Sequence, residues 1–200
     1  MFYFFFNVLK LLAYPAFHAG LYNLPTGMGK VPQLEDFDAD LFGYSDDQAD
    51  LMDAQDRIMM TEAHSALLDA GILPEAIRGT RTGYFWGSFV DQVQSALKDD
   101  FEAKGSIFQH HASRIHEALD LKGPACWLEN GCATSLTALH LAVASIRNGL
   151  CDQALVGGVN ITLDPTKVMW QVDFNTLSAD STCHVFDEKA TGYVKGKRST

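Results

Sequence analysis

In the segment LENGCATSLTALHLA, residues 128–142, a short apolar run meets a helical pattern at a single cysteine, Cys132. Before it, the segment ACWLEN, residues 125–130, predicts a short strand. After it, apolar residues recur at helical spacing with alanines among them, and Gly149 is the kind of residue that ends a helix. The apolar stripe consists of Leu136, Leu139, Val143 and Ile146.

Two further strands are predicted on either side of this stretch. The segment DQALVGGVN, residues 152–160, predicts a buried strand, and its Gly157-Gly158 pair indicates either a close approach of another backbone or a bulge. Upstream, the aromatic segment TGYFWGSFV, residues 82–90, predicts another strand. Strands that alternate with helices predict an α/β fold.

Three helices are predicted upstream of Cys132. The first begins after Asp53, a favoured N-cap residue, and ends before Gly71, since glycine suits the position that follows a helix. The other two helices are predicted over residues 91–104 and 110–119, and the second of these ends before the Gly123-Pro124 pair.

The placement of Cys132 gives its thiol two interpretations. A thiol at the first turn of a helix faces unpaired backbone N–H groups and the positive end of the helix dipole, which favour the nucleophilic thiolate. The same N–H groups can hold the oxyanion that forms when a thioester is attacked. The alternative is a buried, inert cysteine. The other three cysteines lack this placement, and we expect core or surface thiols at Cys126, Cys151 and Cys183.

Composition excludes some classes of function. The chain has 200 residues, 47% of them hydrophobic, and a formal net charge of -10, which argues against a nucleic-acid-binding surface. The cysteine spacing matches neither a small secreted domain nor a zinc site, so we expect a reduced, cytoplasmic compartment and no bound metal.

The first residues are unusual. Residues 1–17 are apolar and aromatic, but Lys10 interrupts them well before a length that spans a bilayer, and no signal-peptide cleavage pattern is present. A membrane anchor is therefore disfavoured. A core strand or helix, or a lead outside the domain, remain as interpretations.

Several segments between Gly20 and Gly196 carry a family resemblance. In chain order they are GLYNLP with GMGKV, FDADLFGYSDDQADLMDAQDRIMM, LLDAGILPEAIRGTRTGYFWG, ASRIHEALDLKGPACWLENGCATSLTALHLA, LCDQALVGGVNITLDP and LSADSTCHVFDEKATGYVKG. Together they resemble the N-terminal half of a β-ketoacyl synthase (ketosynthase) domain, most closely the condensing domain of animal fatty acid synthases and related polyketide synthases. We therefore expect a partial ketosynthase region over residues 20–196, an unrelated apolar lead over 1–19 and an unrelated tail over 197–200.

The resemblance implies a thiolase-like α/β fold, of which this chain carries the N-terminal half of an α-β-α-β-α layered domain. It implies that Cys132 takes an acyl group, as a thioester, from the phosphopantetheine of an acyl carrier protein, with its backbone N–H in the oxyanion hole. Malonyl on the carrier then loses carbon dioxide, and the carbanion attacks the bound acyl group. No cofactor is bound directly. The expected partners are the acyl carrier protein and a second copy of the chain. In the family, the strand that corresponds to residues 125–130 lies at the dimer contact.

The chain departs from the family pattern around the thiol. The family's Asp-Thr-Ala before the cysteine is Glu129-Asn130-Gly131 here, and we expect the backbone freedom of Gly131 to loosen the nucleophile. Ala54 replaces a proline that is favoured at a helix start.

The two catalytic histidine motifs of the family have no counterpart in these residues. His140 lies eight residues after Cys132, roughly 12 Å along a helix, which is too far for a thiol–imidazole hydrogen bond. The other histidines cannot be placed near the thiol from the sequence, and for each a surface or core position is the simpler expectation. They are His18, His64, His110, His111, His116 and His184.

Two functions from different classes stay open. The first is an acyltransferase, a piece of a fatty acid or polyketide synthase, for which we expect acyl transfer but not the complete condensation from residues 1–200 alone. The second is a non-catalytic, truncated ketosynthase that serves only in dimerisation or interaction.

Overall fold

The computed structural model describes residues 2–4, 36–50, 52–88, 113–160 and 166–194. They belong to two units, the first formed by residues 1–8 and 35–160 and the second by residues 9–34 and 161–200. The predicted helix over 91–104 and the histidines at 18, 110 and 111 lie outside the described residues.

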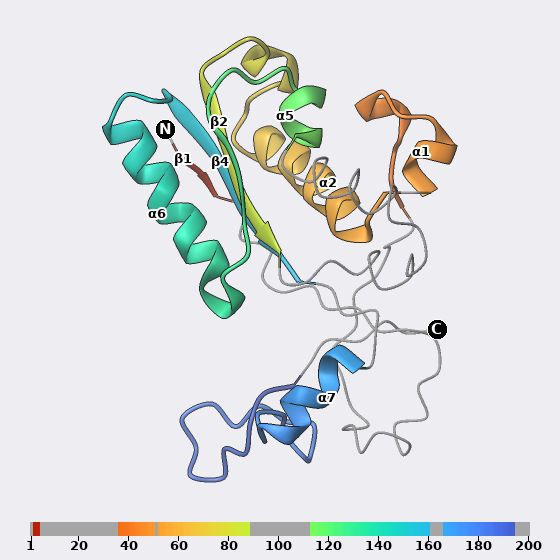
Figure 1. Ribbon diagram of the computed structural model, residues 1–200, viewed down its shortest axis with the longest axis vertical. Coiled ribbons are helices and arrows are strands. Elements are labelled where there is room, and N and C mark those ends of the chain that lie inside the picture. The colour runs from red at the N-terminus through yellow and green to blue at the C-terminus, as the bar shows by residue number, and fades with distance from the viewer. Residues whose placement is uncertain (1, 5–35, 51, 89–112, 161–165, 195–200) are drawn as a thin grey trace. The chain divides into compact units, whose positions relative to one another are not determined.

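A parallel sheet forms the centre of the first unit, with its four strands in the order β1-β4-β2-β3 (Figure 1). The strands are β1 (Phe2–Phe4), β2 (Thr82–Ser88), β3 (Ala125–Leu128) and β4 (Gln153–Val159). β2 and β4 pair over their full lengths, from Thr82 opposite Gln153 to Ser88 opposite Val159. The three strands predicted around and upstream of Cys132 are therefore confirmed within the described residues, although β3 ends at Leu128 instead of continuing to the thiol.

The N-terminal residues take part in this sheet. β1 pairs parallel with β4, from Phe2 opposite Ala154 to Phe4 opposite Val156. Of the interpretations open for residues 1–17, a strand is confirmed for Phe2–Phe4, and residues 5–17 lie outside the described part of the chain.

Two helices of the first unit are long, α2 (Ala54–Asp69) and α6 (Thr134–Arg147). The shorter elements are the helices α1 (Asp46–Asp50) and α5 (Arg114–Ala118) and the 3-10 turns η2 (Asp40–Phe42), η3 (Pro74–Ile77) and η4 (Gly131–Ala133). The position of α5 confirms a helix that ends before Gly123.

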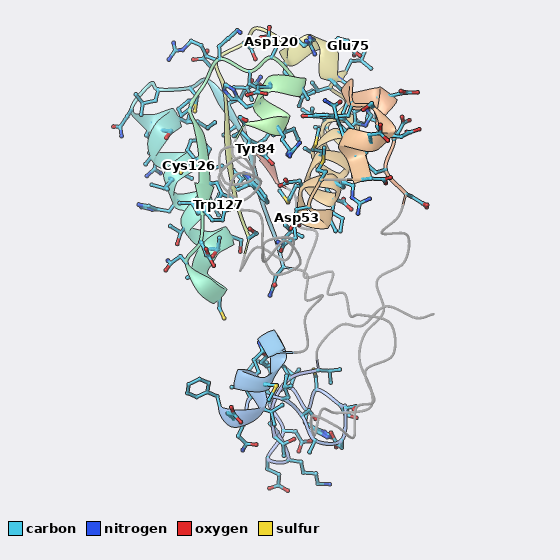
Figure 2. All side chains as sticks on the ribbon, turned by 45° about the vertical axis from the view of Figure 1, so that its right-hand side comes forward. Asp53, Glu75, Tyr84, Asp120, Cys126 and Trp127 are labelled. Atoms are coloured by element: carbon cyan, nitrogen blue, oxygen red, sulfur yellow. The ribbon has the colours of Figure 1, made fainter. Side chains whose placement is uncertain are left out.

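α2 begins and ends where the sequence predicts. The Asp53 carboxylate accepts a hydrogen bond from the backbone N–H of Gln55 at 2.7 Å, which confirms it as the N-cap. Gly71, just past the end of the helix, has a φ of +72°, a left-handed conformation that glycine adopts at little cost. Figure 2 labels Asp53 at this start of α2.

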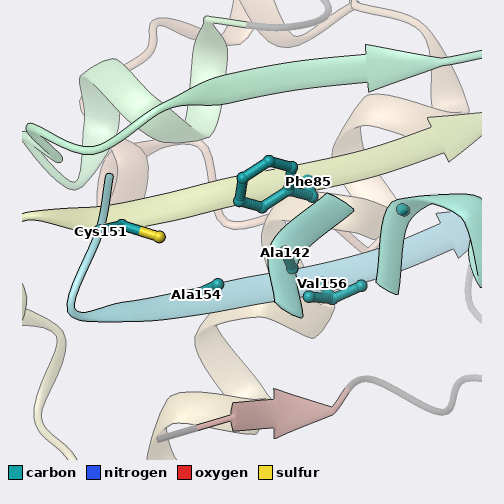
Figure 3. Packing of buried hydrophobic residues seen from close by; sticks show 6 residues of the cluster. Phe85, Ala142, Cys151, Ala154 and Val156 are labelled. Carbon is teal, nitrogen blue, oxygen red and sulfur yellow. The ribbon is translucent and has the colours of Figure 1, made fainter. Parts of the chain in front are cut away.

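The helices cover both faces of the sheet, with α6 on one face and α2 and α5 on the other (Figure 1). Successive residues of a strand point to opposite faces. Phe85 of β2 accordingly packs with Ala138 and Ala142 of α6 (Figure 3). Its neighbours Tyr84 and Trp86 are buried, and their rings stack with centroids 6.4 Å apart. Burial, and secondarily the Asp56 carboxylate of α2, raise the pKa of Tyr84 well above its ordinary value.

The buried face of α6 differs from the predicted apolar stripe. Its buried residues are small and include Ala138 and Ala142. Leu139 and Ile146 pack against the same cluster while only partly buried, but Leu136 is 70% exposed. Of the predicted stripe, Leu136 therefore does not pack against the sheet.

The described residues of the second unit contain α7 (Thr166–Asp173) and an irregular segment that is closed by a bridge between Leu177 and Tyr193. Within this segment, Asp180 accepts hydrogen bonds from Ser178 Oγ at 2.6 Å and from the ring of His184 at 2.8 Å. These two contacts, the one with His184 first, lower the pKa of Asp180 to about 2. Across the described part of the chain, no helix has the length and apolar character needed to cross a membrane.

Candidate active site

Cys132 lies at the junction that the sequence predicts, between a strand and a helix. It is the middle residue of the 3-10 turn η4, which joins the end of β3 to the start of α6. The residue is exposed, so the expectation of a buried thiol is wrong, and the reactivity of Cys132 stays a prediction. The residue lies immediately before a helix of 14 residues and therefore beside the positive end of the helix dipole.

The turn is held by hydrogen bonds that bracket the thiol. The backbone N–H groups of Ala133 and Thr134 donate to the carbonyls of Asn130 and Gly131, respectively. The Thr134 hydroxyl accepts from the backbone N–H of Asn130 at 2.8 Å and donates to the carbonyl of Gly131 at 2.7 Å. The residues on both sides of Cys132 are therefore tied to one another.

The side chain of Asn130 adds a second connection to α6. Its amide nitrogen donates to the hydroxyl of Thr137 at 3.2 Å, and that hydroxyl donates to the carbonyl of Ala133 at 3.0 Å. A residue that departs from the family pattern thus fastens the loop to the first turns of the helix.

Gly131 does not play the role that we expect from the sequence. Its φ is +53°, a left-handed value at which a side chain adds strain and glycine does not. Glycine at this position therefore suits the turn, and the hydrogen bonds around it supply the restraint. The expectation that Gly131 loosens the nucleophile is not supported by this geometry.

Two glycines of the sheet let the start of α6 come close. A Cβ atom added to Gly87 of β2 would collide with Cγ2 of Thr134, and one added to Gly158 of β4 would lie 3.1 Å from Cβ of Ser135. Of the two possibilities open for the Gly157-Gly158 pair, the close backbone approach is thus confirmed at Gly158. The glycines bring the turn with Cys132 against the carboxyl-terminal ends of the strands.

Among the described residues of the first unit, no histidine belongs to the turn that carries Cys132. His140 is exposed on α6. His64 and His116 belong to α2 and α5, on the opposite face of the sheet from α6. The ring of His116 instead lies 2.9 Å from the carbonyl oxygen of Gly123 and joins α5 to the loop that precedes β3.

The other cysteines differ from Cys132 in their surroundings. Cys151 is 1% exposed in the apolar cluster beneath α6, and burial raises the pKa of its thiol. Cys126 is half-buried on β3, where Figure 2 labels it beside Trp127. Cys183 is exposed in the second unit, and its sulfur accepts the backbone N–H of Val194 at 3.2 Å. Within the described ranges, no three His, Cys, Asp or Glu side chains are grouped so as to hold a metal ion.

The family is shown by comparison with known proteins. Residues 19–197 match the family model of the beta-ketoacyl synthase N-terminal domain. The chain belongs to the β-ketoacyl synthase family. Among its relatives are a fatty acid synthase of the goose Anser anser anser, 36% identical over 184 residues, and a highly reducing polyketide synthase of the fungus Cryptosporiopsis sp., 39% identical over 167 residues.

Solved structures show that this ketosynthase chain has the thiolase-like fold. The ketosynthase from module 6 of the bacillaene synthase of Bacillus subtilis 168 matches with a TM-score of 0.75 at 34% identity, over 84% of this chain and 29% of that chain. The oxazolomycin ketosynthase domain OzmH KS7 of Streptomyces albus JA3453 matches with a TM-score of 0.71 at 32% identity, over 84% of this chain and 30% of that one.

The matches cover most of this chain but only part of the relatives. The alignment with the goose protein takes in 89% of this chain and 52% of the relative, and the alignment with the fungal polyketide synthase takes in 80% and 7%. The chain thus spans about half the length of the goose relative.

The sequence predicts the thiol and the junction but misses the residues that hold them. The hydroxyl of Thr134 and the close approach at Gly87 are not anticipated, although both residues lie in segments that carry the family resemblance. A hydroxyl residue two positions after the nucleophile and a glycine near the end of the central strand are the signals that point to them.

Proposed function

We propose that Cys132 is the nucleophile of a ketosynthase and that it accepts an acyl group from the phosphopantetheine arm of an acyl carrier protein. The Cys132 thiolate attacks the thioester carbonyl, the carrier thiolate leaves, and the acyl group remains on Cys132 as a new thioester. The observation that carries this proposal is the exposed thiol in the turn between β3 and α6.

Backbone amides are suited to the second requirement of acyl transfer. The oxygen of the attacked carbonyl gains negative charge, and N–H groups at the start of a helix, which have no acceptor within it, stabilise such a charge. The amide of Cys132 lies in η4, directly before α6. We assign it to the oxyanion hole.

The proposed reaction continues with a malonyl thioester on the same carrier. The malonyl group loses carbon dioxide, the resulting carbanion attacks the thioester carbonyl on Cys132, and the β-ketoacyl product leaves on the carrier while the cysteine regains its thiolate. Groups that stabilise the developing enolate typically contribute ~100- to 10,000-fold each. Neither catalytic histidine motif of the family matches a segment of residues 1–200, so we assign acyl transfer, and not the complete condensation, to residues 1–200 by themselves.

Fatty acid synthesis is the proposed setting. Residues 21–30, LYNLPTGMGK, lie in a segment that resembles animal fatty acid synthases, and the goose relative is a fatty acid synthase. Polyketide synthases of similar identity make polyketide synthesis the second candidate.

A second copy of the chain is the other proposed partner. Among the described strands, β3 lies at one edge of the sheet beside β2, and its residues are exposed or half-buried. A strand at the edge of a sheet is a position where another chain can be added. This edge is where the family resemblance places the dimer contact.

One experiment tests the nucleophile. The purified chain is mixed with acyl-loaded carrier protein and digested, and its peptides are analysed by mass spectrometry. We expect the acyl mass on the peptide that contains Cys132 and its loss in Cys132→Ala. Cys183→Ala, which removes the other exposed thiol, serves as the matched control and should leave the label in place. Acylation spread equally over the exposed cysteines would refute a dedicated nucleophile.

A further inference from the structure

We propose that Thr134 is a positioning residue for acyl transfer, because its hydroxyl holds the turn that presents Cys132. This inference rests on the proposed role of Cys132 as the acyl acceptor. The hydroxyl bonds to Asn130 and Gly131, the two residues directly before the thiol, and it acts on Cys132 through them.

Both hydrogen bonds of the Thr134 hydroxyl join it to residues that precede it in the sequence, and neither joins it to the body of α6. A hydroxyl at a helix start usually caps the amides that follow it. Here the N-cap of α6 is Ala133, which makes no side-chain cap, and the Thr134 hydroxyl bonds Asn130 N–H at 2.8 Å and Gly131 O at 2.7 Å. The side chain therefore restrains the turn and not the helix.

Burial makes this restraint effective. Thr134 is only 6% exposed, whereas Cys132 beside it is exposed. Water competes poorly for hydrogen bonds that are shielded from it, so the hydroxyl keeps its two partners. The Thr134 hydroxyl thus anchors the turn from a largely buried residue, two positions after the exposed Cys132.

The methyl group of Thr134 connects the turn to the sheet. Its Cγ2 occupies the space that the missing side chain of Gly87 leaves free, since a Cβ atom there would collide with it. β2, which carries Gly87, is a central strand with neighbours on both sides. The position of the hydroxyl is therefore fixed by the sheet, and through it so is the backbone next to Cys132.

Acyl transfer depends on this position more strongly than simple alkylation does. The attack on a thioester needs the thiolate and the oxyanion amide in one arrangement, and displacements on the order of 1 Å can lower such rates by about 100-fold. A small alkylating reagent needs only an accessible thiol. The ratio of the two rates consequently separates positioning from general damage to the fold.

The test compares Thr134→Val, which keeps the shape and removes the hydroxyl, with Thr134→Ser, which keeps the hydroxyl. For Thr134→Val we expect the maximal rate of Cys132 acylation by acyl-loaded carrier protein to fall about 10- to 100-fold. The half-saturating carrier concentration and the rate of iodoacetamide alkylation should stay within about twofold. Thr134→Ser should restore most of the acylation rate. Thr61→Val is the matched control, since Thr61 bonds the Arg57 carbonyl on α2, on the other face of the sheet.

Amide exchange reports on the hydrogen bond without any activity. In the wild-type chain the Asn130 amide should exchange at least about tenfold more slowly than an unprotected loop amide, and this protection should disappear in Thr134→Val. If Thr134→Val does not fold, the wild-type measurement and Thr134→Ser still decide the matter. A freely exchanging Asn130 amide in the wild type overturns the inference.

The remaining outcomes are distinguishable. Wild-type acylation rates in Thr134→Val, or equal impairment in Thr134→Val and Thr134→Ser, overturn the role of the hydroxyl while the proposed function stands. A wild-type chain that is never acylated at Cys132 overturns the proposed function itself, and with it this role of Thr134.

Discussion

Arg114 of α5 and Asp56 of α2 form an ion pair in the interior of the first unit, with Nε and Oδ2 3.2 Å apart and side chains that are 18% and 3% exposed. The guanidinium also lies 5.9 Å from the centre of the Tyr44 ring. Asp56 and Tyr44 both come from the segment that resembles the family's second block. That block therefore contributes a buried contact between α2 and α5, on the face of the sheet opposite α6.

Removal of Arg114 should destabilise the chain strongly. In Arg114→Met the Asp56 carboxylate stays buried and loses this cation, and loss of one partner of a buried pair costs about 3–5 kcal/mol. Urea unfolding followed by circular dichroism measures the change. Asp152→Asn is the control, because the pair of Asp152 with Arg81 is solvent-exposed and such pairs contribute about 0–1 kcal/mol. Equal changes in the two variants would contradict this account.

Two adjacent leucines of α2 should respond differently to truncation. Leu67 is 0% exposed and Leu68 is 49% exposed. Leu67→Ala leaves a cavity in the core and should lower the free energy of unfolding by about 2–5 kcal/mol. Leu68→Ala should change it by no more than ~0.5 kcal/mol. Chemical denaturation of both variants is the measurement, and a larger loss in Leu68→Ala would show that α2 buries the other face.

Cys132 should react with iodoacetamide before the other cysteines at neutral pH. It is exposed beside the start of α6, whereas Cys151 is buried and its thiol pKa is raised by burial. Cys183 is the informative comparison, since it is exposed but lies in an irregular segment and not directly before a helix. Peptide mass spectrometry after brief labelling gives the order. Equal labelling of Cys132 and Cys183 would show that exposure alone governs the reaction.

The segment around Asp180 should keep its hydrogen bonds into strong acid. Its pKa is lowered from 3.8 to about 2, first by His184 and then by Ser178. A group with a lowered folded-state pKa stabilises its contacts above the unfolded value, and that contribution is lost as the pH falls toward the folded value. The carboxyl carbon of Asp180, followed by NMR, should titrate near pH 2 in the wild type. In His184→Gln the midpoint should rise toward the ordinary value. An unchanged midpoint in that variant would remove His184 as the main cause.

The side of α6 that carries Leu136 and Val143 should promote self-association of the 200-residue chain. Leu136 is 70% exposed, and Val143, two turns further along the same side, is only partly buried. Apolar residues grouped in this way favour association. We expect light scattering to show dimers or larger species and Leu136→Lys to reduce the larger ones. Leu73→Lys, at a similarly exposed leucine, should not. A stable monomer of the wild-type chain would refute the prediction.

Local signals in the sequence determine where the elements begin and end. Asp53 accepts the Gln55 amide at the start of α2, and Gly71 takes the left-handed conformation at its end. Both effects depend on residues a few positions apart, so the sequence itself contains all that is needed to predict them. The junction of strand, Cys132 and helix is predictable for the same reason.

Which side of α6 is buried, and which residues hold the turn with the thiol, depend on contacts between elements that are distant in sequence. The start of α6 lies close to the sheet because Gly87 and Gly158, distant in sequence, leave room for Thr134 and Ser135. The helix buries Ala138 and Ala142 and leaves Leu136 exposed, and the Thr134 hydroxyl bonds Asn130 and Gly131. The candidate nucleophile and the family can be inferred from the amino-acid sequence, because they depend on patterns of residues within short segments. The support of the nucleophile depends on which strands lie side by side, and only packing of the whole sheet decides that.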